Sequence, residues 1–326
     1  MVRRAGRDGH ALQIRFPVTE GRAEVRSLRL LITGANGMVG RAAAAHCAFL
    51  GDEVLASDHS ALDITDEGAV RTFFERVRPE AVINCAAWTD VDACQSNPER
   101  AFAVNAKGPE NLAVNCRRVG AALVTISTDY VFDGTKDGFY TQRDDPNPQS
   151  VYGAAKLEGE RLAAKASART VIVRTGWIFG PGGKNFLATS VNRLLAGERL
   201  KLIRDAHGTP TYAPHLAARL RELAERDIPG IFHVVNSGDG ASFEEFVRCA
   251  LRWVPHDPAQ IESVCMSSLQ RPAPRPVNSR LFCLLSEALG LEPLPHWQEA
   301  LKDFAARTIE SEGQRPSQTT TILRSA

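Results

Sequence analysis

Long apolar runs are absent from this 326-residue sequence, and none of its hydrophobic stretches approaches the roughly 20 residues of a membrane-spanning helix. The segment before Leu28 is rich in arginine but has no apolar centre, unlike a secretory signal peptide. Its acidic residues Asp8, Glu20 and Glu24 argue against an organelle transit peptide. We therefore expect a soluble, cytoplasmic protein in which residues 1–27 form a flexible N-terminal extension.

A large excess of charge is also lacking, because 39 lysines and arginines oppose 38 acidic residues and leave a formal net charge of +1. Composition thus gives no electrostatic reason to expect binding to nucleic acid or to an anionic membrane, and small molecules are the expected partners. The seven cysteines are scattered, with no Cys-x-x-Cys pair and no histidine at a zinc-ligand spacing. We interpret them as reduced thiols of a cytosolic protein.

What is present is a regular alternation of strand-like and helical segments. Strand patterns occur at 28–33, 53–57, 81–87, 121–127 and 170–174, and helical patterns at 41–50, 66–77, 109–119 and 152–166. Parallel strands need a crossover that returns the chain to the same edge of the sheet, and the intervening helices can supply it. The pattern predicts an α/β fold with a doubly wound, mostly parallel sheet.

The regularity decreases after Gly180, where glycines at 182–183 and prolines at 210 and within 271–276 interrupt short helical pieces. We expect residues 181–308 to form a smaller C-terminal lobe. One strand-like run within it, at 230–235, is predicted to return to the main sheet. The polar stretch 309–326 is predicted to be a flexible tail.

Three glycines, Gly34, Gly37 and Gly40, follow the first strand and open the first helix. Glycine lets the backbone approach a pyrophosphate closely, and the helix N-terminus offers free N–H groups to it. The spacing resembles that of the extended short-chain dehydrogenases and predicts a Rossmann-like, NAD(P)-binding domain over residues 28–180. The alternative is a glycine-rich turn that only packs a helix on a strand.

Asp58 ends the second strand, 24 residues after Gly34. A carboxylate there can accept hydrogen bonds from the adenosine ribose hydroxyls, whereas the 2′-phosphate of NADPH would meet like charge. The sequence therefore favours NADH slightly over NADPH. His59, the next residue, is a competing feature because a protonated imidazole can bind that phosphate weakly.

A second motif consists of Tyr152 and Lys156, which lie one turn apart on one face of a predicted helix. Thr128 stands at the end of the preceding strand, where its hydroxyl can face the phenol. Reduction of a ketone needs an acid for the oxygen that gains charge as hydride arrives, and an adjacent ammonium lowers the pKa of a tyrosine toward neutrality. These three residues are the predicted catalytic group.

With these motifs placed, the sequence resembles the dTDP-4-dehydrorhamnose reductase family of the extended short-chain dehydrogenase/reductase superfamily. The resemblance runs from about Leu28 to Lys302 and rests on separated segments: 33–40, 62–65, 84–92, 127–132, 151–156, 174–177, 208–211 and 278–281. It implies NADH- or NADPH-dependent reduction of the C4 ketone of a nucleotide-diphospho-4-keto-6-deoxyhexose in deoxysugar biosynthesis, by a monomer or homodimer.

The resemblance also implies roles for individual residues. Tyr152 is the expected proton donor, and Thr128 and Lys156 complete the catalytic triad. The expected cofactor-binding residues are Gly34, Asn36, Gly37, Met38, Val39, Gly40, Asp58, Asp63, Ile64, Ala86, Ala87, Trp88, Asn105, Tyr152 and Lys156. The expected substrate-binding residues are Thr128, Asp129, Tyr130, Trp177, Arg271 and Arg280, the two arginines as candidates to hold the substrate pyrophosphate.

Two departures from the family pattern change the expectations. Members that dimerise through magnesium use a glutamate shortly after the glycine-rich turn, where this chain has Arg41 and Ala42, so we expect no metal. Trp88 stands where tyrosine or histidine is usual, close to the expected nicotinamide.

Two other functions stay open at the level of sequence. The first is a sugar-nucleotide dehydratase or epimerase, although dehydratases have an acid where this chain has Tyr130, and elimination needs a carboxylic acid/base pair. The second is a cofactor-binding regulatory subunit like the methionine adenosyltransferase β-subunit. The presence of all three predicted catalytic residues, Thr128, Tyr152 and Lys156, favours an enzyme.

Overall fold

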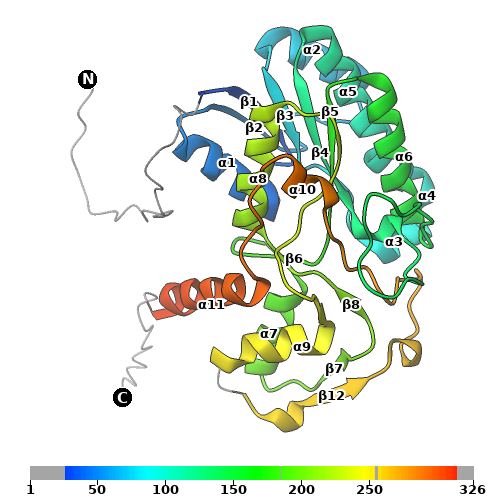
Figure 1. Ribbon diagram of the computed structural model, residues 1–326, viewed down its shortest axis with the longest axis vertical. Helices are drawn as coiled ribbons and strands as arrows, with labels where there is room; N and C mark the ends of the chain where they lie inside the picture. Colours follow the sequence, from blue (N-terminus) through cyan, green and yellow to red (C-terminus); the bar gives the residue numbers. More distant parts are fainter. Residues whose placement is uncertain (1–25, 184, 254–255, 314–326) are drawn as a thin grey trace, which may run out of the picture.

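The computed structural model describes residues 26–183, 185–253 and 256–313, arranged as a large α/β unit with a smaller lobe beneath it in Figure 1. Most of the predicted N-terminal extension and of the predicted tail lies outside these residues. The predicted end of the N-terminal extension and the predicted start of the tail differ from the structure. Ser27 already donates a hydrogen bond to the Gly51 carbonyl, and the last helix continues to Gly313, five residues into the predicted tail.

Six parallel strands form the central sheet, in the order β10-β5-β4-β3-β1-β2. Their bounds are β1 Arg29–Thr33, β2 Glu53–Ser57, β3 Ala81–Asn84, β4 Ala122–Thr128, β5 Thr170–Thr175 and β10 Gly230–His233. The α/β prediction is confirmed. The segment predicted to return to the main sheet is its edge strand β10, which pairs in parallel with β5. The chain places β2 on one side of β1 and then β3 on the other, so the strand order changes direction between β1 and β3. Ligands of open α/β sheets bind at such a point.

Helices cover both faces of the sheet (Figure 1). One face carries α1 (Met38–Phe49) and α8 (Ala213–Arg226), and the other carries α2 (Glu67–Val77), α5 (Gly108–Val119) and α6 (Val151–Ala166). Successive side chains of a strand point to opposite faces, so Leu30 and Ile32 pack in the core with α1 and α8, whereas Leu31 packs in the core with α2 and α5. Both faces of the sheet are therefore buried, which explains the nearly continuous apolar strands.

Three short helical segments connect β3 to α5: α3 (Val91–Ser96), α4 (Pro98–Phe102) and the π-helix η1 (Ala103–Lys107). The 3-10 turn η2 (Asp129–Val131) follows β4 directly. Asn97 caps α4 through a hydrogen bond from the Arg100 N–H, and Ser150 caps α6 through one from the Gly153 N–H. The cap at Ser150 fixes the start of α6 at Val151, one residue before Tyr152.

The second lobe holds short strands and helices. They are β6 Ile178–Phe179, α7 Phe186–Leu195, β7 Leu200–Ile203, β8 His207–Gly208, β9 Thr211–Tyr212, β11 Ala241–Ser242, α9 Phe243–Ala250, β12 Ile261–Val264 and α11 Trp297–Gly313. An aromatic and aliphatic core that includes Phe179, Leu187, Phe246 and Trp297 holds it together. The short helix α10 (Leu284–Ala288) lies instead beside α8 on the large unit (Figure 1), and Leu289 and Leu291 after it pack in the core of the main sheet.

The predicted boundary at residue 181 does not divide the structure cleanly. Leu216, Leu220 and Leu223 of α8 are buried in the core of the main sheet, although α8 belongs by sequence to the predicted lobe. The segment 213–233 therefore completes the unit built on the central sheet, because its apolar helix face and its strand are buried there. Among the described helices, none combines the length and the apolar character needed to cross a membrane.

Candidate active site

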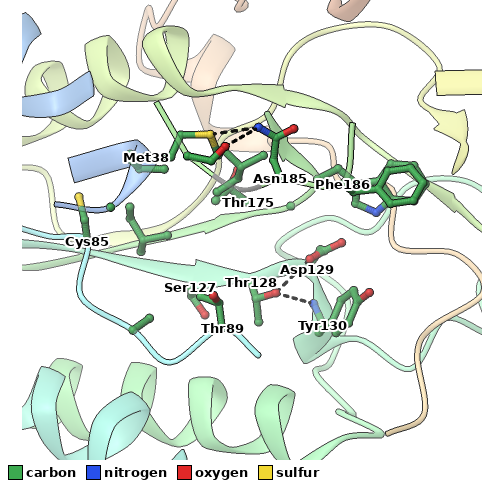
Figure 2. A pocket seen from close by; sticks show the side chains of 18 of the residues that line it. Met38, Cys85, Thr89, Ser127, Thr128, Asp129, Tyr130, Thr175, Asn185 and Phe186 are labelled. Carbon is green, nitrogen blue, oxygen red and sulfur yellow. Dashed lines mark hydrogen bonds between the residues drawn. The ribbon is translucent and has the colours of Figure 1, made fainter. Parts of the chain in front are cut away.

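A cavity of about 640 Å³ opens at the carboxyl end of the central sheet, between it and the second lobe. Residues that follow β1, β3, β4 and β5 contribute to one wall, and residues of β6, α7 and α9 contribute to the other. Among the predicted residues, those that line it are Asn36, Gly37, Met38, Val39, Gly40, Ala86, Ala87, Thr128, Asp129, Tyr130, Tyr152, Lys156 and Trp177. Figure 2 shows several of these side chains converging on the cavity.

The glycine-rich turn has the shape that a pyrophosphate site needs. Gly34 has a φ of +65°, and a Cβ there would lie 2.6 Å from the Ala86 nitrogen. A Cβ on Gly40 would lie 2.2 Å from the Gly34 carbonyl oxygen. The helix α1 begins with Gly37 as N-cap, without a side-chain cap and without an acidic residue in its first turn. The positive end of α1 thus faces the cavity and suits an anionic group.

Asp58 lies at the end of β2, outside the cavity lining, and is held firmly. Its Oδ1 accepts hydrogen bonds from the Ser60 hydroxyl and from the Ser60 and Ala61 N–H groups, and its Oδ2 accepts one from the Asn36 amide at 2.5 Å. These bonds, above all that from the Ser60 hydroxyl, keep the pKa of Asp58 below its ordinary value. The carboxylate is therefore fixed beside the glycine-rich turn, with Asn36 connecting the two.

Five other predicted cofactor residues lie outside the cavity lining, and one of them is Gly34 at the start of the glycine-rich turn. Asp63 accepts hydrogen bonds from the N–H and the hydroxyl of Thr65. Ile64 is buried in the core, where a Cβ on Gly108 would touch it. Asn105 exchanges two hydrogen bonds of 2.9 Å with the backbone of Trp88, and the Trp88 ring lies beneath the Arg100 guanidinium. The structure thus gives Asn105 a supporting position behind the cavity wall, since its amide is already engaged.

The three predicted catalytic residues meet at the cavity, where β4 ends beside α6. Thr128 is the last residue of β4, and its Oγ1 accepts a hydrogen bond from the Tyr130 N–H at 3.1 Å. Tyr152 is 9% exposed, and its ring lies edge-on to Tyr130, with centroids 6.1 Å apart. The Lys156 Nζ donates to the Ile126 carbonyl at 2.6 Å. The turn after β4 thus holds the Thr128 hydroxyl, and the backbone of β4 holds the Lys156 amine.

Burial governs the protonation of these groups. It raises the pKa of the Tyr152 phenol, an effect that the Thr128 hydroxyl opposes and the Asp129 charge reinforces. It lowers the pKa of Lys156 to about 8. The expected lowering of the phenol pKa by Lys156 is therefore not the leading effect in the structure, because desolvation of both groups favours their neutral forms.

Asp129 places a buried carboxyl in the same cavity. Its Oδ1 accepts a hydrogen bond from the Thr128 hydroxyl at 3.0 Å, as Figure 2 shows, and its Oδ2 is buried without a hydrogen-bond partner among the described residues. Burial raises its pKa to about 6, while the Ser279 and Thr128 hydroxyls oppose the shift. A Cβ on Gly176 would lie 2.4 Å from its carboxyl carbon, so the backbone packs directly against this group.

An aromatic wall faces the catalytic residues from the second lobe. Trp177 has a φ of +49° and stacks on Phe243, with ring centroids 3.9 Å apart. Phe186 packs edge-on against Phe243 and is 42% exposed. A Cβ on Gly208 would overlap the Trp177 ring, so glycine is required beside it. The wall gives the cavity an apolar side opposite its polar one.

The two arginines expected to hold the substrate pyrophosphate lie outside the cavity lining. Arg280 donates to the Asn278 side-chain oxygen and lies over the Phe139 ring, outside the cavity lining. Arg271 is also outside it, but its charge acts on Tyr130, which lines the cavity. Sequence reasoning missed the anchoring role of Arg275, which binds both carboxylate oxygens of Asp92 at 2.8–2.9 Å and fastens the proline-rich segment to α3. Arg275 lies in the same proline-rich run as Arg271, but nothing local to that run indicated its partner.

Arg41 follows the third glycine and lines the cavity. Its Nη1 donates to the Asn36 carbonyl at 2.5 Å, so the guanidinium lies along the glycine-rich turn. Within the described part of the chain, no three or more His, Cys, Asp or Glu side chains gather as a metal site would require.

A glycine-rich turn at a helix N-terminus, next to a Thr, Tyr and Lys cluster at the carboxyl end of a parallel sheet, defines a short-chain dehydrogenase/reductase. Residues 28–309 match the family model described as "RmlD substrate binding domain", and the chain belongs to that family. Its fold and the resemblance inferred from its motifs are thereby confirmed.

Known relatives cover nearly the whole protein. The chain is 41% identical over 302 residues to a dTDP-4-dehydrorhamnose reductase of Mycolicibacterium smegmatis, covering 91% of each chain. The crystal structure of a dTDP-4-dehydrorhamnose reductase from Clostridium acetobutylicum matches with a TM-score of 0.83 at 38% identity, covering 86% of this chain and 99% of that one. The enzyme of the same name from Bacillus anthracis, in complex with NADP, matches with a TM-score of 0.83 at 32% identity, covering 86% and 100%.

Proposed function

We propose that this protein uses a reduced nicotinamide cofactor to reduce the C4 ketone of a dTDP-linked 4-keto-6-deoxyhexose. The observation that carries the proposal is the meeting of Thr128, Tyr152 and Lys156 in one cavity below an open helix N-terminus. The names of its relatives, which share about two fifths of its sequence over nine tenths of its length, support the same reaction.

The residues around the glycine-rich turn fit a dinucleotide. The N-terminus of α1 would hold the pyrophosphate, Asp58 would accept hydrogen bonds from the adenosine ribose, and Lys156 would donate to the nicotinamide ribose. When bound, the reduced cofactor supplies the hydride. The protein must then orient the ketone, stabilise the charge that develops on its oxygen and deliver a proton to that oxygen.

Tyr152 is the group placed to deliver the proton. Its phenol is protonated at neutral pH, since burial raises its pKa. In the reaction one O–H bond of Tyr152 breaks and one forms on the product hydroxyl, which leaves a phenolate. The Lys156 ammonium stabilises that phenolate, and Thr128 orients the ketone oxygen toward the phenol. Asp129 Oδ2, which has no partner among the described residues, would accept a hydroxyl hydrogen of the sugar.

Elimination is disfavoured as an alternative reaction by the same geometry. Asp129 is the one carboxylate among the described residues that line the cavity, and Tyr130 follows it. A dehydratase needs a carboxylic acid/base pair at this place to remove the C5 proton and expel the C6 hydroxyl. A purely regulatory role is disfavoured because all three residues of the catalytic group face the cavity.

For the cofactor we propose a preference for NADH over NADPH, because the Asp58 carboxylate, which Asn36 holds beside the glycine-rich turn, would accept hydrogen bonds from the adenosine ribose and repel a 2′-phosphate. The NADP complex of the Bacillus anthracis relative indicates that the family can also bind the phosphorylated form. We further propose that the protein acts as a monomer or homodimer, without metal.

The test of the reaction is to offer the purified protein dTDP- and GDP-linked 4-keto-6-deoxysugars with NADH or NADPH and to identify the products by NMR. A C4 alcohol formed together with one equivalent of oxidised cofactor is the expected result. Cofactor binding without turnover of any of these sugars would instead support the regulatory reading. A sugar that has changed configuration without net oxidation of cofactor would support the epimerase reading. Loss of water from a nucleotide-linked hexose that still carries its C6 hydroxyl, tested in parallel, would support the dehydratase reading.

A further inference from the structure

Directly behind the catalytic residues lies a buried pair of opposite charges, Glu160 and Arg174. The Arg174 Nε and Nη2 donate to both Glu160 oxygens at 2.7–3.2 Å, and each side chain is only 4% exposed. The Ser127 hydroxyl donates to the Glu160 Oε1 at 2.5 Å. Ser127 and Arg174 are partners in the register of β4 and β5, so both side chains point to the face of the sheet that α6 covers.

Glu160 follows Lys156 by one helical turn, which places both on the same side of α6. Lys156 is buried, and burial is the largest influence on its amine, lowering its pKa to about 8. The Glu160 charge is the largest influence in the opposite direction, followed by that of Cys85. The reaction proposed above uses the charged amine, and Glu160 favours that form.

The other ionisable groups near α6 act elsewhere. Asp129, Tyr130 and Cys94 bear on Tyr152, and His233 of β10 is held neutral, its pKa lowered to about 4 by burial and by the Arg174 charge. The remaining charged side chains of the helices packed on α6 are exposed or half-buried: Asp92, Glu99, Arg100, Lys107, Glu110, Arg117 and Arg118. Solvent screens them. Burial raises the pKa of the Cys85 thiol and keeps it neutral, so among the described residues Glu160, paired with Arg174, is the buried charge that acts on Lys156.

We propose that the Glu160–Arg174 pair sets the charge on the Lys156 amine: Glu160 favours the ammonium form, and Arg174 limits that effect while it stabilises the buried carboxylate. Both are positioning residues that act through Lys156, and the inference deepens the proposed reductase function and rests on it for its purpose. A neutral residue in place of Glu160 removes a negative charge near Lys156, and a neutral residue in place of Arg174 removes a positive one. Both replacements disrupt the same buried pair.

The experiment measures Lys156 directly, without turnover. The protein has seven lysines, so lysine labelled with ¹³C at Cε gives few signals, and a Lys156→Met spectrum identifies the one of interest. Glu160→Gln should move the titration midpoint of this signal to lower pH, because the attractive charge is lost and the Arg174 charge acts alone. Arg174→Gln should move it to higher pH. A charge within about 4–6 Å shifts a pKa by about 1–3, which such a titration resolves.

The matched controls separate charge from structure. Ser127→Ala removes a hydrogen bond to Glu160 without changing a charge and should leave the midpoint in place. The double variant Glu160→Gln/Arg174→Gln should titrate below Arg174→Gln alone, which tests the role of Glu160 even if Glu160→Gln does not fold. Equal midpoints in wild type and Arg174→Gln, or shifts of the same sign in the two single variants, would overturn the proposal. An inactive protein with the expected opposite shifts would instead contradict the reductase function alone.

Discussion

The Thr128 hydroxyl donates its hydrogen to Asp129 Oδ1 at 3.0 Å, so the residue expected to orient the substrate ketone is engaged with a carboxyl next to it in sequence. A hydroxyl has one hydrogen, and it cannot donate to the ketone or the phenolate while it donates to Asp129. Asp129 therefore competes with the reacting oxygen for Thr128. Its protonation, or a sugar hydroxyl bound to its second oxygen, weakens that competition.

Asp129 also makes a testable contribution to stability. Burial raises its pKa from 3.8 to about 6, so the folded protein holds a proton that the unfolded chain releases between these values. The stabilisation that this proton contributes to the free energy of unfolding is complete below about pH 4 and is lost as the pH rises to about 6. Asp129→Asn should raise the free energy of unfolding above pH 6 by up to about 3 kcal/mol and remove this part of the pH dependence. Urea unfolding of both proteins between pH 4 and 8 measures it, and parallel curves would contradict it.

Tyr152→Phe should lower kcat at least about a hundredfold while leaving the Kd of the cofactor nearly unchanged, because the ring still packs and only the transferable proton is lost. Single-turnover kinetics and fluorescence titration with NADH measure the two quantities. A variant that keeps more than about a tenth of the wild-type kcat would exclude Tyr152 as the proton donor.

Asp58→Ala should shift the ratio of kcat/KM for NADH and NADPH toward NADPH, because the negative charge that would meet the 2′-phosphate is removed. The ratio is measured with one accepted sugar in both proteins. Asn36→Ala is the matched control, since it removes a hydrogen bond to Asp58 but leaves the charge. A wild-type preference for NADPH, or an unchanged ratio in Asp58→Ala, would show that another residue selects the cofactor.

Gly40→Ala should lower the free energy of unfolding by about 1–3 kcal/mol, because its Cβ would meet the Gly34 carbonyl oxygen at 2.2 Å and force α1 away from the turn. Gly37→Ala is the control: its Cβ would meet the same oxygen at 3.2 Å, so stability should change far less. Cofactor binding should weaken in both, because both residues line the cavity. Equal losses of stability would show that the close approach at Gly40 is relieved by a backbone shift.

Added magnesium or EDTA should change neither activity nor oligomeric state. Arg41 stands where relatives that use magnesium have a glutamate, and its guanidinium is bound to the Asn36 carbonyl. Gel filtration and initial rates with and without EDTA test the expectation. An EDTA-sensitive dimer would reveal a metal site built from other carboxylates.

The sequence by itself determined the α/β fold and the parts of the cavity lining that belong to the glycine-rich turn, the end of β4 and the start of α6. Strand periodicity, the glycine spacing and the pair Tyr152 and Lys156 are local patterns, and each depends only on neighbouring residues along one strand, turn or helix. The tyrosine and lysine lie one turn apart whatever the rest of the chain does. Thr128 joins them because carboxyl ends of parallel strands share one edge of the sheet.

Only the tertiary structure decided which polar residues were free to act. Asn105 looked available in the sequence, but two hydrogen bonds to the Trp88 backbone engage its amide. Arg275 and Asp92 are far apart in sequence and meet only after folding. The same holds for Glu160 and Arg174, whose effect on Lys156 depends on distance and burial rather than on spacing along the chain. Burial likewise reversed the expected direction of the Tyr152 pKa, because desolvation arises from every element that packs around a group, and no local pattern contains that information.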